Sequence, residues 1–190
     1  MFTEHRDPLH RGSIIWLNTP NWRLDPTASR VSVLAKTFWG LVTVRGGFRG
    51  IAGEANVPAD GPVSAELTID AASIDTDNDR RDRHLRSPDF FHVGRHPYLH
   101  VAICQVVLTS PETFAADGHM TVAGCTQPVS IEGSIAVSPD GCRAEVDATA
   151  TVDRVAFGLD HSPLGMISRV VQGQAHLVFR AAEPGASGSR

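Results

Sequence analysis

Apolar and polar residues alternate with a period of two through most of the chain. The clearest segments are residues 63–70, 129–137 and 143–150. Successive side chains of a strand point to opposite faces of the sheet, so each segment is predicted to be a strand with one buried face. Residues 99–108 are apolar at nearly every position, and we expect both faces of that strand to be covered. Weaker alternation covers residues 31–38, 41–48, 51–57, 114–122 and 170–180.

Turn sequences separate these segments and limit the possible folds. Asp-Gly pairs at residues 60–61, 117–118 and 140–141 indicate tight turns. Many short strands with one buried face favour an antiparallel sandwich or barrel. Residues 77–86 are predicted to form the one helix, and a parallel sheet is excluded because the crossover helices that it needs are missing.

Composition narrows the class of protein further. The chain has 190 residues, 42% hydrophobic and 20% charged, with a formal net charge of -4. These values are typical of a soluble globular domain and exclude a disordered chain, a collagen and a coiled coil. The acidic balance argues against nucleic acid as a partner. Neither a transmembrane segment nor a signal peptide is evident, so we expect a cytoplasmic protein.

Three groups of residues with reactive side chains can be explained without a catalytic or metal-binding role. Cys104, Cys125 and Cys142 form no C-x-x-C pair, and we interpret them as small buried side chains without an obligatory disulfide. The histidines at positions 92, 96 and 100 recur every four residues, but Gly94 and Pro97 between them prevent a helix that would align them on a metal. The Asp-His-Ser sequence at 160–162 is a polar loop, because neighbours in the chain cannot form a catalytic triad. We therefore expect no catalysis, no metal and no cofactor.

Small residues on the predicted inner face leave unfilled volume in a closed sheet. An eight-stranded barrel is just wide enough to be filled by side chains or to hold one small ligand. Unfilled volume lowers stability unless a ligand occupies it. A fully packed barrel remains an alternative at this point. The small inward positions are Ala35, Gly46, Ala65, Ala148 and Ala175.

Several stretches of the chain resemble the YceI-like family of lipid-binding proteins. The most specific runs from Ser73 to Phe91 and continues to Pro97. The others are Trp22-Arg-Leu-Asp25-Pro with Ser29, Val31 and Val33, then Val44-x-Gly46-x-Phe48 followed by Gly53, Val122-x-Gly124-x-Thr126-x-Pro128-Val129, and Arg154-x-x-Phe157-Gly158-Leu159. The chain departs from the family where Ala28 and Thr37 occupy positions of the first strand that often carry histidines.

The resemblance implies an all-β fold, a lipocalin-like antiparallel β-barrel of about eight strands with one short helical segment near residues 77–91. It implies non-catalytic binding, storage or transport of a long hydrophobic ligand, a polyisoprenoid or similar lipid, and for some members a homodimer. The first alternative is a closed-core structural or dimerising module without a ligand. The second and weaker alternative is an enzyme that uses the barrel mouth. We divide the chain into an N-terminal extension (1–20), the barrel domain (21–181) and a flexible tail (182–190).

The segment between residues 77 and 91 combines charges with large apolar side chains. Arg81, Asp82 and His84 cannot lie in an apolar pore, so we expect them to face solvent or to form ion pairs. The large apolar side chains either line the pore mouth or plug the barrel end. The mouth or lid residues are predicted to be Phe38, Trp39, Leu85, Phe90 and Phe91. The pore lining is predicted to be Val33, Ala35, Val42, Val44, Phe48, Leu67, Ile69, Val101, Ile103, Ile131, Ile135, Val146, Ala148, Leu177 and Phe179.

Overall fold

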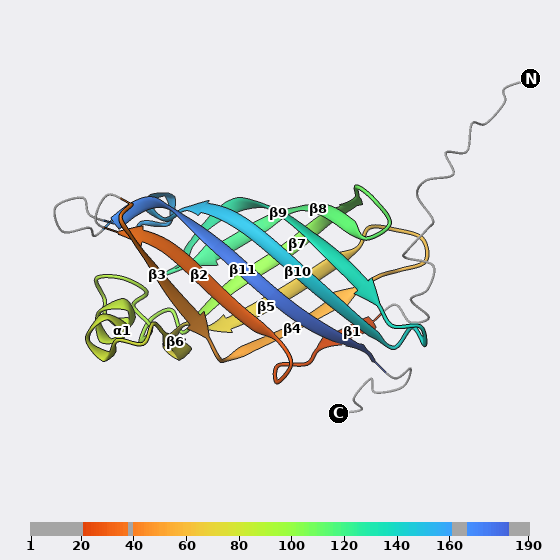
Figure 1. Ribbon diagram of the computed structural model, residues 1–190, viewed down its shortest axis with the longest axis horizontal. Helices are drawn as coiled ribbons and strands as arrows, with labels where there is room; N and C mark the ends of the chain where they lie inside the picture. Colours follow the sequence, from red (N-terminus) through yellow and green to blue (C-terminus); the bar gives the residue numbers. More distant parts are fainter. Residues whose placement is uncertain (1–20, 38–39, 161–166, 183–190) are drawn as a thin grey trace, which may run out of the picture.

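A computed structural model describes residues 21–37, 40–160 and 167–182 (Figure 1). The predictions for the N-terminal extension, for Phe38 and Trp39, and for nearly all of the C-terminal tail fall outside these residues. Within the described ranges, no helix is both long and apolar enough to cross a membrane.

Most of the described residues lie in strands. They are β1 (Asn21–Leu24), β2 (Arg30–Thr37), β3 (Val42–Phe48), β4 (Ile51–Asn56), β5 (Ser64–Asp70), β6 (Ile74–Asp75), β7 (Tyr98–Leu108), β8 (Thr113–Val122), β9 (Cys125–Val137), β10 (Arg143–Asp153) and β11 (Ile167–Ala181). The helix α1 spans Asp79–Arg86, and two short 3₁₀ helices, η3 (Ala71–Ser73) and η4 (Arg154–Phe157), follow β5 and β10. Each long alternating segment of the sequence forms one of these strands.

Eight strands close into an antiparallel barrel. The ring runs β1-β4-β5-β7-β8-β9-β10-β11, and β1 pairs with β11 to close it, with Trp22 opposite Ala181. The 15 residues of β11 are long enough to pair with β10 on one side and with both β1 and β2 on the other. The prediction of an antiparallel barrel with one short helix is confirmed.

The two ends of the barrel differ in their connections (Figure 1). At the end called here the helix end, β2 meets β3, residues 71–97 with α1 join β5 to β7, and β10 passes into η4. At the opposite end, the turn end, short connections follow β4, β7 and β9 at residues 57–63, 109–112 and 138–142. The helical segment therefore covers part of one end only.

The expectation that both faces of residues 99–108 are covered is wrong. A β-bulge between Ile103 and Gln105 shifts the phase of β7 by one residue. Val101 and Ile103 face inward before the bulge, and Val106 faces inward after it. Apolar residues therefore occur at both odd and even positions, although only one face of the strand lies inside the barrel. The expected turn at Asp117-Gly118 is also wrong, because these residues lie inside β8, opposite the bulge.

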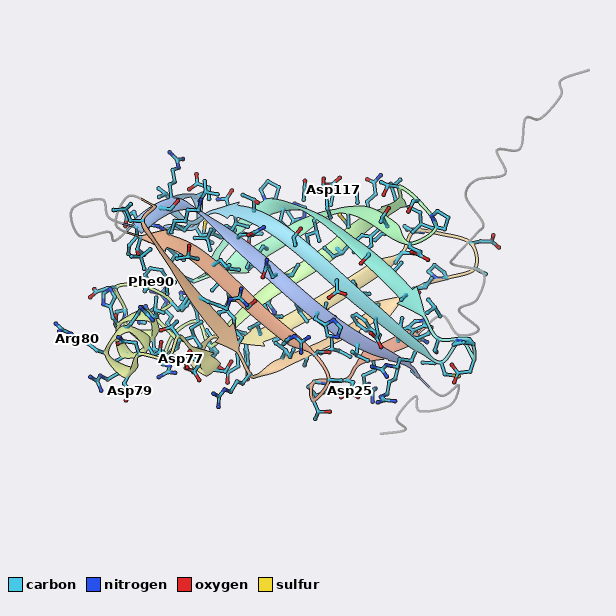
Figure 2. The ribbon with its side chains drawn as sticks, in the orientation of Figure 1. Asp25, Asp77, Asp79, Arg80, Phe90 and Asp117 are labelled. Carbon is cyan, nitrogen blue, oxygen red and sulfur yellow. The ribbon has the colours of Figure 1, made fainter. Side chains whose placement is uncertain are left out.

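Hydrogen bonds to buried groups hold the helical segment together. Asp82 is buried and accepts hydrogen bonds from Thr76, at 3.1 Å from the backbone N and 2.5 Å from the hydroxyl Oγ1. The Arg81 guanidinium donates to the same hydroxyl and to the Thr76 carbonyl. Asp82 is thus an acceptor for loop groups, which corrects the expectation that it faces solvent or forms an ion pair. Asp79 and Arg80 lie on the side of α1 away from the barrel (Figure 2).

The aromatic residues after α1 close part of the helix end. Phe91 is buried, and its ring centroid lies 6.2 Å from that of Phe48 on β3. Phe90 meets Phe91 edge to face at 5.0 Å, and Leu85 packs against the same core. Gly46 makes room for this arrangement, since a Cβ there would lie 2.9 Å from Thr76 Cγ2.

We predict that Asp82→Ala destabilises the protein by about 1–3 kcal/mol, because the backbone N–H and hydroxyl of Thr76 lose their acceptor in a buried site. Urea unfolding of the variant measures this loss. Asp89→Ala is the control, since Asp89 is exposed, and we expect it to change the free energy of unfolding by less than about 0.5 kcal/mol. Equal effects of the two substitutions would contradict the proposed role of Asp82.

Asp25 joins β1 and β2 to the closing strand (Figure 2). Its carboxylate accepts from the Thr27 hydroxyl at 2.7 Å and from Arg180 Nε at 2.9 Å. These two hydrogen bonds lower the pKa of Asp25 to about 2, the bond from Thr27 contributing most. The Asp25 carboxylate therefore links the connection between β1 and β2 to β11, the strand that closes the ring.

The lowered pKa of Asp25 predicts a loss of stability in acid. A carboxyl whose pKa falls on folding stabilises the native state above its unfolded value of 3.8, and this contribution disappears as the pH falls toward about 2. Asp25→Asn removes this titration, so the melting temperature of the variant should fall less steeply than that of the wild type between these pH values. Parallel pH profiles for the two proteins would contradict the prediction.

Candidate ligand cavity

An apolar cavity of about 280 Å³ lies inside the barrel. Side chains from every strand of the ring contribute to its lining, together with inward residues of β2 and β3. The cavity extends from Val57 and Val63 near the turn end to Val33 and Val152 toward the helix end. Each contribution follows from alternation along a strand, which places every second side chain inside.

Most residues of the predicted pore lining meet in this cavity. Ala35, Val42 and Val44 do not belong to its lining. They lie further along the β2–β3 hairpin toward the helix end, and Val42 is 46% exposed there. The predicted residues that line the cavity are Val33, Phe48, Leu67, Ile69, Val101, Ile103, Ile131, Ile135, Val146, Ala148, Leu177 and Phe179.

The predicted lid residues of the described chain lie outside the cavity. Leu85, Phe90 and Phe91 do not line it but pack on the core beside it. Their arrangement matches the alternative in which they plug the barrel end. Phe38 and Trp39 lie outside the described residues.

Small side chains on β10 and β11 leave the volume open. Ala148 pairs with Ala175, and Ala150 pairs with Gly173, so four small residues adjoin on the inner face. A Cβ built on Gly173 would meet no atom closer than 3.7 Å. The cavity is therefore bordered on this side by backbone and methyl groups, and a larger side chain would enter it.

Among the described residues, no charged side chain of the lining is directed inward. Glu66, Thr149 and Gln174 border the cavity, but each occupies the outward phase of its strand, between inward neighbours. The pKa values of four aspartates, Arg154 and Arg169 are shifted, and none of these groups lines the cavity. The described lining can exclude water and enclose a hydrocarbon.

Sequence reasoning missed several cavity residues. Val106 and Leu108 follow the bulge in β7, and Met120 lies on β8 beyond the supposed turn. Phe114 lines the cavity beside Gly133, whose Cβ would lie 2.8 Å from the Phe114 ring. The aromatic residue opposite an inward glycine was the available signal, because such a ring covers the gap that the glycine leaves.

Arg154 anchors the connection after β10. Its side chain is buried and donates hydrogen bonds to the carbonyl groups of Leu159, Ile167 and Ser168. Burial lowers the pKa of Arg154 below its usual value. The side chain therefore joins η4 to the first residues of β11 at the helix end, and its role is structural.

In the described part of the chain, the cysteines and histidines are dispersed over several elements. All three cysteines are free, but Cys104 and Cys142 are exposed and Cys125 is half-buried, so the interpretation as buried side chains is wrong. Among the described residues, no three His, Cys, Asp or Glu side chains are grouped closely enough to hold a metal ion. His92 and His96 contact each other with ring centroids 6.0 Å apart, and the ring of His96 lies against Gly124.

Residues 22–179 match the YceI-like domain, and the chain belongs to that family. Among its curated relatives, a UPF0312 protein of Pseudomonas paraeruginosa is 32% identical over 123 residues, which are 63% of this chain and 62% of that protein. A UPF0312 protein of Ectopseudomonas mendocina is 31% identical over 133 residues, which are 67% of this chain and 69% of that protein. The chain therefore matches somewhat less than two thirds of the length of the Pseudomonas relative.

Solved structures share the fold. BcnA of Burkholderia cenocepacia superposes with a TM-score of 0.73 at 22% identity, covering 82% of this chain and 98% of BcnA. A polyisoprenoid-binding domain from Saccharophagus degradans, implicated in plant cell wall breakdown, superposes with a TM-score of 0.70 at 15% identity, covering 87% and 100%. A YceI protein of Campylobacter jejuni gives 0.67 at 22% identity, covering 75% and 88%. At these identities the likeness establishes the fold alone.

A charge placed inside the cavity should destabilise the barrel. We predict that Val146→Asp lowers the free energy of unfolding by several kcal/mol, roughly, because an unpaired carboxylate meets only apolar groups there. The melting temperature and the pH dependence of the variant test this, since burial raises the pKa of such a carboxyl. Thr151→Asp, on the exposed face of the same strand, is the control and should melt near the wild-type temperature.

Proposed function

We propose that the protein binds a long hydrophobic ligand, a polyisoprenoid or similar lipid, inside the barrel without transforming it. The observation that carries the proposal is the continuous apolar lining of a cavity that extends along the barrel. Removing apolar surface from water is favourable by about 25 cal/mol per Å², from which the costs of association are subtracted. A hydrocarbon chain therefore binds here without any polar contact.

The same lining limits the chemical class of the ligand. A carboxylate, phosphate or hydroxyl inside the cavity would lose its hydration without gaining a hydrogen-bond partner from the lining side chains. The cavity therefore takes the chain of an amphiphile, and its head group stays at one end of the barrel. The Saccharophagus degradans domain of the same fold is described as polyisoprenoid-binding, which supports this class of ligand.

Two other functions have less support. A closed-core module requires a packed interior, whereas small residues on β10 and β11 border open volume here. An enzyme at the barrel mouth requires a reactive group beside the bound molecule, and the described cavity lining contains no group of shifted pKa. The cytoplasmic location, a homodimer and the absence of a cofactor stay predictions.

Ala148→Phe tests the proposal, because it places a ring in the volume assigned to the ligand. We expect the variant to lose bound lipid while its melting temperature stays close to the wild-type value, since the ring fills open space between Ala148 and Ala175. Mass spectrometry of organic extracts measures the lipid that each protein retains. Uptake of dansyl-labelled farnesol, followed by fluorescence, measures binding by delipidated protein.

Ala136→Phe is the matched control. Ala136 is exposed on β9, on the outer face of the barrel, and its replacement should leave both lipid retention and probe uptake unchanged. A wild type that retains no lipid and binds no probe, together with an Ala148→Phe variant destabilised by about 1–3 kcal/mol, would show a packed core and refute the proposal.

A further inference from the structure

Large exposed apolar side chains gather at one side of the helix end. Leu41 is 85% exposed and Val42 46% exposed, where β2 meets β3. Val155 on η4 is 37% exposed, and Val170 on β11 is 49% exposed. Single exposed valines are common, but Leu41 and Val42 are consecutive exposed apolar residues, and Val155 and Val170 lie on neighbouring elements at the same end. These four residues are called here the apolar rim.

Strand pairing holds the members of the apolar rim together. Val42 is opposite Thr37 on β2, and Thr37 is in turn opposite Ile167 on β11. Val170 is opposite Asp153, the last residue of β10, and Val155 follows two residues later. The rim therefore lies on the β2–β3 hairpin, on η4 after β10 and on β11, and the strands β10, β11, β2 and β3 are neighbours in the sheet (Figure 1).

The apolar rim continues the inner surface of the cavity. Val33 lines the cavity, and the next inward pair, Ala35 and Val44, leads along the hairpin to Val42. On the neighbouring strands, Val152 lines the cavity, whereas Val170 lies on the outer face of β11, opposite Asp153, whose carboxylate forms a salt bridge with Arg169. An apolar path along the β2–β3 hairpin therefore connects the ligand cavity with the exposed rim.

Charge distinguishes the rim from the opposite end of the barrel. Exposed cations lie beside the rim at Lys36 and Arg45, and in the described part of the chain neither forms a salt bridge. Each of the three connections at the turn end carries an exposed acidic side chain instead: Asp60, Glu112 and Asp140. The hairpin side of the rim has no acidic residue between positions 34 and 48, whereas Asp153 and Asp160 lie at its other side, so this distribution orients the hairpin toward an anionic surface.

We propose that the apolar rim docks the barrel onto an anionic lipid bilayer, so that the ligand chain passes between the bilayer and the cavity without crossing water. The proposal rests on the proposed function, because it assigns a route to the same ligand. Apolar side chains enter the boundary between head groups and acyl chains, and adjacent cations contact the anionic head groups. Lys36 and Arg45 are placed for the second role, beside the apolar residues of the hairpin.

Vesicle co-sedimentation tests docking without any ligand. The wild type should bind vesicles of phosphatidylcholine with about one third phosphatidylglycerol, and it should bind vesicles of phosphatidylcholine alone more weakly. Leu41→Asp/Val155→Asp should lower binding to the anionic vesicles roughly tenfold or more, because two exposed apolar side chains no longer enter the bilayer. Val107→Asp is the control, since Val107 is 44% exposed but lies on β7 near the turn end, and its binding should stay within about twofold of the wild type.

A charge reversal keeps the test valid if the double variant folds poorly. Lys36→Glu changes an exposed side chain and should weaken binding to anionic vesicles severalfold while leaving the melting temperature unchanged. Arg30→Glu, at the opposite end of the same strand, should leave vesicle binding unchanged. Equal losses for Lys36→Glu and Arg30→Glu would contradict a role for the rim.

Probe uptake separates the docking proposal from the proposed function. Leu41→Asp/Val155→Asp should take up dansyl-labelled farnesol slowly from anionic vesicles but at the wild-type rate from dilute ethanol solution. A wild type that binds no vesicles, or one whose vesicle binding the double variant retains, would overturn the docking proposal. The docking proposal would also be overturned if the wild type were a dimer that binds no vesicles and the double variant were a monomer, because a second copy would then cover the rim. Vesicle binding without probe uptake from ethanol would support docking and refute the proposed function.

Discussion

The closure of the sheet by β11 is the constraint on which the rest of the structure depends. This strand pairs with β10 along its length and with β1 and β2 on its other edge. Closure joins the two edges of the sheet and turns one face of each strand into an interior surface. The Asp25 carboxylate supports the closure where β1 ends, by binding Arg180 of β11. Without these pairings, the apolar residues of the other strands would form an open sheet with no cavity.

The interior balances stability against capacity. Ala148, Ala175 and Gly173 give up packing contacts that larger residues would make, and the protein compensates with dense apolar clusters beside the cavity. Phe48 and Phe91 pack against each other at the helix end, and Trp22 and Phe179 are buried where β1 meets β11. A ligand that binds only the folded barrel raises its stability by mass action, so the empty protein is the less stable form.

Alternation along the strands predicts most of the barrel and most of its lining, because a strand has only two faces and closure buries one of them. This prediction fails where the alternation of inward and outward residues shifts by one position. The bulge at residues 103–105 places Val101 and Val106 on the same face although they are five positions apart, and no local residue pattern marks it. Alternation also assigns Val42 to the lining, because it does not show how far along the hairpin the cavity extends.

Charge patterns were less informative than apolar ones. Asp82 resembles the acidic residues around it in the sequence, yet it alone among the described carboxylates is buried, because the loop at Thr76 folds back over α1. The cysteines show the opposite case, since Cys104 and Cys142 lie on outward or turn positions that their residue type does not indicate. In both cases the environment is set by segments distant in space from the local pattern.

The pairing of Trp22 with Ala181 also has a consequence for the order of folding. Contacts between residues so far apart in sequence form slowly, because a long loop must close before they contribute any stability. During synthesis the strands up to β10 emerge before β11, and their apolar faces have no interior to enter until it arrives. An unfinished chain therefore exposes the surfaces that later enclose a ligand, and it is most prone to aggregation in the interval before its last strand pairs.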